Sequence, residues 1–213
     1  MKFFQHFLPG TPLEENNHRS MGIVIQQISD KESYSFVRGL QIDLAKAELT
    51  ETQRDALTTS SAFNNATRPK GKHYDYEVDS LVYAFFGGIE DLYLNESLNF
   101  FADARAEFIE YEYSNRMISG NTREDGTKCG FGGCYYNRPS DRTDDFNEVS
   151  ARMGLVTNYE IINYFFQVSL GFRPPQINEA YRLQKKQTVS DLDAETLTMY
   201  ELGSKFNLKT VNG

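Results

Sequence analysis

Tryptophan is absent from this sequence, and only two cysteines and three histidines occur among its 213 residues. Two cysteines are too few for a disulfide-rich scaffold or a four-cysteine zinc site. No run of 18 apolar residues occurs, so no transmembrane helix is predicted. Acidic residues outnumber basic ones by 30 to 22, and the resulting net charge of -8 argues against a nucleic-acid-binding surface. A β-barrel membrane protein stays possible, because alternating strands have a polar average hydropathy.

Residues 161–173 form the most informative stretch, because apolar and polar side chains alternate along it. The even positions from Ile162 to Phe172 are all apolar, whereas the odd positions from Asn163 to Arg173 are mostly small, polar or charged. Successive side chains of a β-strand point to opposite faces, so the pattern predicts a strand with one apolar face. Its length suits a transmembrane β-strand, which needs about 9–11 residues.

Alternation and turn signals predict an all-β, antiparallel up-and-down meander of about eight strands. The expected strands cover about 3–8, 21–25, 36–44, 74–86, 97–113, 149–155, 161–173 and 195–207. Long connections near 8–19, 49–72, 114–145 and 174–194 alternate with short ones near 30–33, 87–95 and 158–160. Outer-membrane barrels have this alternation of long external loops and short periplasmic turns. After Phe108 the pattern breaks at Glu110 and Glu112, which indicates either a β-bulge or a strand that continues above the membrane.

The sequence also resembles the barrel of TonB-dependent outer-membrane receptors. The motifs that carry the resemblance are Gly171-Phe172-Arg173-Pro174-Pro175-Gln176, Asn178-Glu179-Ala180-Tyr181-Arg182-Leu183-Gln184, Asp191-Leu192, Glu195 and Tyr200-Glu201-Leu202-Gly203-Ser204-Lys205. Residues 73–78, Asn121-Thr122-Arg123 and the Cys129–Cys134 loop are similar to a marine-type subgroup of that family. The specific part of the resemblance lies between residues 146 and 206.

The resemblance implies a 22-stranded barrel in the outer membrane of a Gram-negative bacterium, with an N-terminal plug domain inside it. It implies a receptor that binds a scarce solute, most often a ferric chelate, and imports it with energy from the TonB complex. The implied partners are therefore the plug domain, the TonB complex, outer-membrane lipid and a small solute such as an iron chelate. The resemblance implies no enzymatic reaction and no cofactor.

We expect residues 1–213 to be part of such a barrel domain. The sequence shows no plug domain, no signal peptide in its first eight residues and no closing strand that ends on an aromatic residue. One alternative is a complete eight-stranded outer-membrane barrel, which is an established size. Another is a secreted, soluble β-sandwich that binds carbohydrate or acts as an enzyme, with its apolar faces buried between two sheets.

Charged residues at the polar positions of the expected strands are predicted to face the lumen and a plug. They are Asp103, Arg105, Glu107, Arg152, Arg173, Glu201 and Lys205. The alternative is that they form the solvated face of an amphipathic sheet. A second set lies at a junction between strand and loop, where either a structural role or ligand contact is open: Arg173, Glu179, Tyr181 and Arg182.

Cys129 and Cys134 flank Gly130-Phe131-Gly132-Gly133 in an expected external loop. An oxidising location favours a disulfide, and the glycines let the backbone bend tightly enough. Two free thiols or half of a metal site are the alternatives, although no ligand spacing links the three histidines.

Paired carboxylates and clustered tyrosines complete the candidates. Glu14-Glu15, Asp75 with Glu77 and Asp144-Asp145 could serve a glycosidase, but we interpret them as solvated loop charge. Tyrosines near the ends of strands are candidates for two aromatic girdles: Tyr74, Tyr76, Tyr111 and Tyr113 near one end, Tyr159 and Tyr164 near the other.

Overall fold

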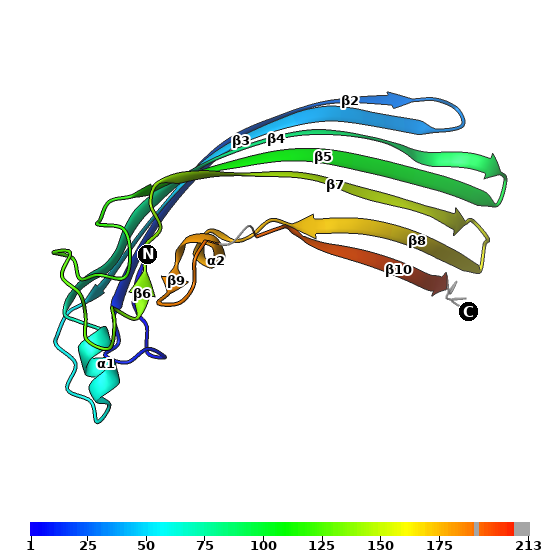
Figure 1. Cartoon of the computed structure of the whole chain (residues 1–213). Coiled ribbons are helices and arrows are strands. Elements are labelled where there is room, and N and C mark those ends of the chain that lie inside the picture. The colour runs from blue at the N-terminus through cyan, green and yellow to red at the C-terminus, as the bar shows by residue number, and fades with distance from the viewer. Residues whose placement is uncertain (190–191, 207–213) are drawn as a thin grey trace.

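Eight antiparallel strands form one long, curved sheet in a computed structural model that describes residues 1–189 and 192–206 (Figure 1). The order in the sheet is β1-β2-β3-β4-β5-β7-β8-β10, so each strand pairs with its neighbours along the chain. The strands are β1 (Lys2–Phe4), β2 (Leu13–Asp30), β3 (Ser35–Gln53), β4 (Gly71–Asn95), β5 (Leu98–Asn115), β7 (Arg142–Thr157), β8 (Ile162–Arg173) and β10 (Glu195–Phe206). The predicted all-β, antiparallel meander is confirmed.

A small cap covers the concave side of the arch at one end (Figure 1). It contains two short helices and a separate two-stranded sheet. These elements are α1 (Ala62–Thr67), α2 (Ile177–Tyr181), β6 (Tyr136–Asn137) and β9 (Leu183–Gln184). The sequence pattern predicted neither helix. Local capping explains both: the Ser61 side chain accepts from the Asn64 N–H, and Gln176 forms a capping box with Glu179.

Short and long connections alternate as predicted. Short connections join β2 to β3 at 31–34, β4 to β5 at 96–97 and β7 to β8 at 158–161, all at one end of the sheet (Figure 1). Long segments at 54–70, 116–141 and 174–194 lie at the other end and build the cap. Residues 190–191 of the last segment and 207–213 after β10 lie outside the described residues, as do Asp191 of the family-like motif and the expected C-terminal turn.

Several predicted boundaries were wrong; residues 49–53 and 142–145, for example, were expected in loops and belong to β3 and β7. Residues 13–19, expected in a loop, belong to β2 and pair with Lys46–Thr52 of β3, because backbone pairing continues although the side chains are polar. Gly87 and Gly88, expected to open a turn, lie inside β4. A Cβ atom on Gly88 would stand 2.6 Å from the Asp103 Cβ and 2.7 Å from the Ala102 carbonyl oxygen, so this glycine permits close backbone approach and does not mark a turn.

The break in alternation after Phe108 is not a bulge. β5 keeps an uninterrupted register with β4 from Ala102 to Asn115 and with β7 from Leu98 to Tyr113. Glu110 and Glu112 therefore lie on the same face as Phe108, further along a strand that extends past the apolar region.

The sheet has two open edges among the described residues. β1 pairs with Leu13–Glu15, and Met1 hydrogen-bonds the backbone of Asn16, which leaves the outer edge of β2 from Asn17 to Asp30 unpaired; β10 pairs only with β8. No pairing joins β1 to β10 in the described parts of the chain, so these eight strands do not close a barrel by themselves. Within the same residues, no helix is long and apolar enough to cross a membrane.

Candidate functional site

One face of the sheet presents a broad apolar band outward. Residues that pair directly across antiparallel strands share a face, so the register assigns each side chain. The band contains Met21, Ile23, Ile25, Leu40, Ile42, Leu44, Leu81, Tyr83, Phe85, Ala106, Phe108, Val149, Met153, Leu155, Phe166, Val168, Leu170, Tyr200 and Leu202. Several of these side chains are about half or more exposed, including Met21 at 72%, Phe85 at 57% and Leu202 at 79%. An apolar surface this extended marks a membrane or protein contact.

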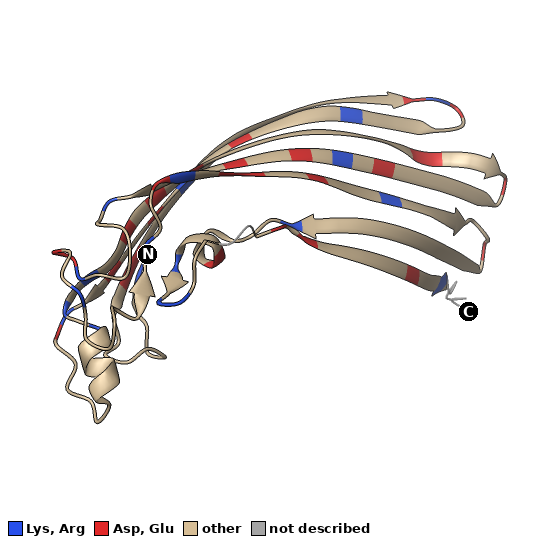
Figure 2. Ribbon diagram, in the orientation of Figure 1, with Lys and Arg blue, Asp and Glu red and all other residues tan. Residues whose placement is uncertain are grey.

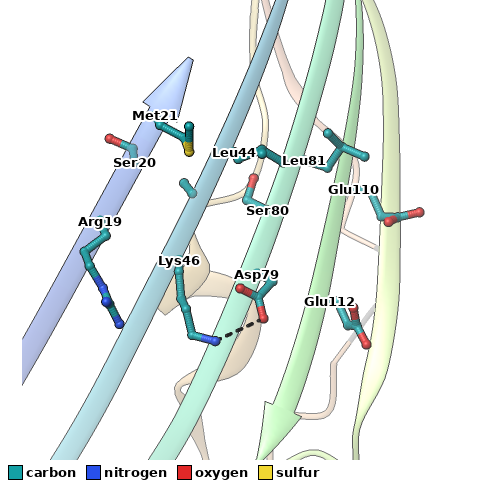
Figure 3. A pocket seen from close by; sticks show the side chains of 11 residues that line it. Arg19, Ser20, Met21, Leu44, Lys46, Asp79, Ser80, Leu81, Glu110 and Glu112 are labelled. Atoms are coloured by element: carbon teal, nitrogen blue, oxygen red, sulfur yellow. Dashed lines mark hydrogen bonds and ion pairs between the residues drawn. The ribbon is translucent and has the colours of Figure 1, made fainter. Parts of the chain in front are cut away.

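The band ends sharply where charged residues begin on the same face. Figure 3 shows this boundary at a hollow of about 480 Å³, with Met21, Leu44 and Leu81 toward one end and charged side chains toward the other. Lys46 points to Asp79, at 3.5 Å between Nζ and Oδ2, and also forms an ion pair with Glu77. Along the strands, charge is sparse over the apolar band and dense at the capped end (Figure 2).

The opposite, concave face carries the residues predicted to face a lumen. The register places Asp103, Arg105, Glu107, Arg152, Arg173, Glu201 and Lys205 together on it. Arg152 pairs across strands with Asp103, at 2.7 Å between Nη2 and Oδ2, and Arg105 pairs with Glu107. The Gln167 side chain donates to Glu201 at 2.6 Å. Four of these charges thus form two ion pairs along the concave wall, and no described helix or second large sheet covers them.

The cap is held to the concave face by stacked tyrosines. Tyr181 of α2 is fully buried, stacks on Tyr113 of β5 with 4.5 Å between ring centroids, and donates to Asp144 at 2.7 Å. Tyr74 and Tyr76 of β4 are also buried there, and their hydroxyls donate to the Leu183 carbonyl and the Asn178 side chain. Burial raises the pKa of Tyr74, so its hydroxyl stays a donor. The prediction that Tyr74, Tyr76, Tyr111 and Tyr113 form an external girdle was therefore wrong, because their positions face the cap.

Arg138 ties the 116–141 segment together from inside. The side chain is 1% exposed. Its guanidinium donates to the carbonyls of Ile118 at 2.7 Å, His73 at 3.1 Å and Thr122 at 2.7 Å, and to the Thr122 hydroxyl. Five hydrogen-bond donors in a rigid fork suit this task, which a lysine could not perform. No sequence motif singled out this residue.

A disulfide joins Cys129 to Cys134, as expected, and both residues are buried in the cap. The ring of Phe131 between them contacts the Phe63 ring of α1 edge-on, with centroids 5.5 Å apart. The Tyr135 N–H donates to the Thr67 carbonyl at 2.9 Å. The disulfide loop therefore fastens α1 to the rest of the cap.

The predicted ligand candidates do not form one surface. Arg173 pairs with Glu179 at 3.1 Å and Glu195 at 3.2 Å, where it ties the start of the 174–194 segment to β10. Tyr181 is buried against β5. Arg182 points elsewhere, into the cap interior. Of the two roles left open for this group, the contacts of Arg173, Glu179 and Tyr181 are those of structural residues.

Arg182 belongs to a buried charge network that the sequence pattern missed. Its guanidinium forms ion pairs with Glu51 and with Glu14, the latter at 3.0 Å between Nη1 and Oε2. His73 lies between two acceptors, with Nδ1 3.1 Å from Glu51 and Nε2 2.8 Å from the Pro69 carbonyl. Both contacts can be hydrogen bonds only when each ring nitrogen carries a proton. The interpretation of Glu14 and Asp144 as solvated charge was wrong, because Glu14 is 2% exposed and Asp144 accepts from the buried Tyr181.

These charges shift the pKa of Glu51, which lies seven residues beyond the apolar band on β3. Burial favours a raised pKa, but the hydrogen bond from His73 and the Arg182 charge outweigh it and the pKa is lowered. If the alternation of β3 is extended past Leu49, it places Glu51 on the concave face. The position of Glu51 could therefore have been predicted from the sequence.

A hollow of about 270 Å³ opens beside this network. Its lining includes Glu51, Arg68, His73, Tyr135 and Arg182. Arg68 follows α1 and stacks over Tyr135, with its Cζ atom 3.9 Å from the ring centroid. Among the described residues, no group of three or more metal-ligating side chains occurs.

Comparison with protein-family models finds no match to this chain, and comparison with curated proteins finds none either.

Proposed function

We propose that this chain forms part of the wall of an outer-membrane β-barrel receptor that imports a scarce solute. The observation that carries the proposal is the two-faced sheet: one face is an exposed apolar band, and the other is lined by paired charges. Strands of 12 to 25 residues, short turns at one end and long structured segments at the other support a membrane-spanning barrel.

The open edges favour a part of a larger barrel. In a bilayer, unpaired backbone N–H and C=O groups cost several kcal/mol each, so the free edges of β2 and β10 require further strands. A complete eight-stranded barrel would need β1 to pair with β10. A soluble sandwich would need a second sheet over the apolar band, and the described residues contain only the two-stranded β6–β9 sheet besides the main one.

The finer parts of the proposal rest on the motif resemblance between residues 146 and 206. They are a 22-stranded parent with a plug, energy supplied by TonB, and a ferric chelate as the imported solute. In this proposal the apolar band contacts lipid, the concave charges face the plug or the solute path, and the cap lies at the cell surface.

The experiment is uptake of a radiolabelled ferric chelate by iron-limited cells that carry or lack the full gene, with and without a functional TonB complex. We expect the protein to be found in the outer-membrane fraction, and we expect uptake to require both the gene and TonB. Recovery of the protein as a monodisperse soluble species without detergent would contradict the membrane assignment. Membrane localisation with uptake that is independent of the gene would contradict the solute class alone.

A further inference from the structure

Arg68 differs from Arg138 and Arg182, the other two arginines that point into the cap. Arg138 donates to several carbonyls and Arg182 pairs with two carboxylates, whereas the Arg68 side chain makes no hydrogen bond or ion pair with any residue that the structure describes. Its Nε atom is buried without a partner, and the residue is only 9% exposed. Buried guanidinium groups are normally paired directly, whereas the charge of Glu51 acts on this one only from beyond ion-pair distance.

The Arg68 side chain lines the 270 Å³ hollow, and its surroundings leave it available to a ligand. Tyr135 covers one face of the guanidinium, which leaves its edge of N–H donors to bind in the plane. The Tyr136 ring, stacked on His73 with 4.4 Å between centroids, forms a second aromatic wall of the same hollow.

The arrangement of charges favours an occupant with one negative charge. Arg182 pairs with both Glu14 and Glu51, so the Arg68 guanidinium lines the hollow without an ion pair to any described residue. A dianion would meet repulsion from the two carboxylates. A guanidinium fork matches the planar geometry of a carboxylate, which it binds through two parallel hydrogen bonds.

The volume of the hollow limits the size of the ligand. Drug-sized ligands occupy pockets of roughly 300–1,000 Å³. A hollow of about 270 Å³ suits a small molecule, or one end of a larger one. Tyrosine walls favour a flat body next to the carboxylate.

We propose that the cap hollow lined by Arg68, Arg182, His73 and Tyr135 is a binding site for a small, flat monocarboxylate. The Arg68 guanidinium binds the carboxylate in a bidentate manner, and the tyrosine rings contact the body of the ligand. The site is a property of the cap and does not require that the chain transports anything.

The test is calorimetric titration of the full chain, folded in detergent micelles, with sodium benzoate as the probe. Tyrosine fluorescence gives a second readout, since the chain contains no tryptophan. We expect saturable one-site binding with a Kd of about 1 mM or tighter, weaker binding of inorganic phosphate, and no binding of benzamide, which has the same ring without the charge.

Two variants at position 68 and one control assign the site. R68Q should weaken benzoate binding about tenfold or more, since it removes a charge-assisted hydrogen-bonding group. R68K keeps the charge but loses the fork, and should weaken binding severalfold even if R68Q fails to fold. K70Q removes a positive charge from an exposed neighbour and should leave binding unchanged. Equal benzoate affinity in wild type, R68K and R68Q would overturn the proposal, as would tighter binding of phosphate than of benzoate, or no saturable binding of benzoate to the folded wild-type chain.

Discussion

Removal of the Arg138 guanidinium should loosen the cap without unfolding the sheet. The side chain is buried and donates to four backbone carbonyls and one hydroxyl, which lie in the 116–141 segment and in β4. R138M keeps much of the volume but leaves these acceptors without a donor. A hydrogen bond to a charged group contributes about 1.5–3 kcal/mol, and the effects of bonds from one side chain are not additive.

The expected loss is therefore about 3–5 kcal/mol, the range for a buried network that loses one partner. The loss of stability should be confined to the 116–141 segment, because the strands of the main sheet keep their own backbone hydrogen bonds. Hydrogen exchange is the assay. Three amides report the stability of the cap, because each donates a hydrogen bond of 2.7–2.9 Å within it: those of Gly120, Cys134 and Tyr135. A loss of about 3 kcal/mol corresponds to a drop in protection of more than a hundredfold.

R123M is the matched control, since Arg123 lies in the same segment but its side chain is exposed. It should leave protection unchanged. R138K should recover less than half of the loss, because a lysine ammonium is a single point and cannot reach three separated carbonyls at once. Unchanged exchange in R138M, or equal exchange in R138M and R123M, would refute the assignment of Arg138 as the central hydrogen-bond donor of the cap.

Three further predictions concern the disulfide, the buried charges and the apolar band. Without reductant, intact mass after alkylation should show no label on Cys129 or Cys134. The double serine variant should destabilise the cap by about 2 kcal/mol, as expected for so small a ring, and two labelled thiols in untreated protein would exclude the disulfide. Because the folded-state pKa of Glu51 is lowered from 4.5, the stability that this carboxylate contributes is complete above that pH and is lost as the pH falls through the lower folded value. Acid titration of cap exchange should show the loss, E51Q should remove that component, and an identical acid profile in E51Q would contradict it. In lipid vesicles, I42R on the outer face should lower unfolding free energy by about 2–4 kcal/mol relative to Q41R on the concave face, and equal effects in urea unfolding would argue against lipid contact.

The strands over the apolar band could be predicted from sequence, because a period of two fixes both the strand and its faces. Residues 162–173 contain six apolar residues in alternation, and the structure places β8 at the same positions. The shared face of Asp103, Arg105 and Glu107 followed from the same rule. Alternation fails beyond the apolar band, so the ends of β2 and β3 near Glu14 and Glu51 were placed in loops.

The cap could not be derived from local pattern, because its contacts join residues far apart in the chain. The Tyr74 hydroxyl donates to the Leu183 carbonyl, and Arg182 forms an ion pair with Glu51. The partners in each contact are more than 100 residues apart in the sequence and are brought together only by the fold. Arg68 lies in the long connection expected at 49–72, where the sequence pattern did not single it out. The turn after β4 was predicted too early, at Gly87 and Gly88. Gly88 permits close packing of neighbouring strands, and the turn is formed by Glu96 and Ser97.

A spin-label scan along β3 from Gly39 to Ala47, with the full chain reconstituted in lipid vesicles, would show whether the apolar band contacts lipid. We predict a period of two: oxygen accessibility should peak at positions 40, 42 and 44, where side chains lie in the apolar band, and a water-soluble nickel reagent should reach positions 39, 41 and 43 on the concave face. Equal access of the nickel reagent to both sets of positions would show that the apolar face does not contact lipid, and would contradict the proposed barrel wall.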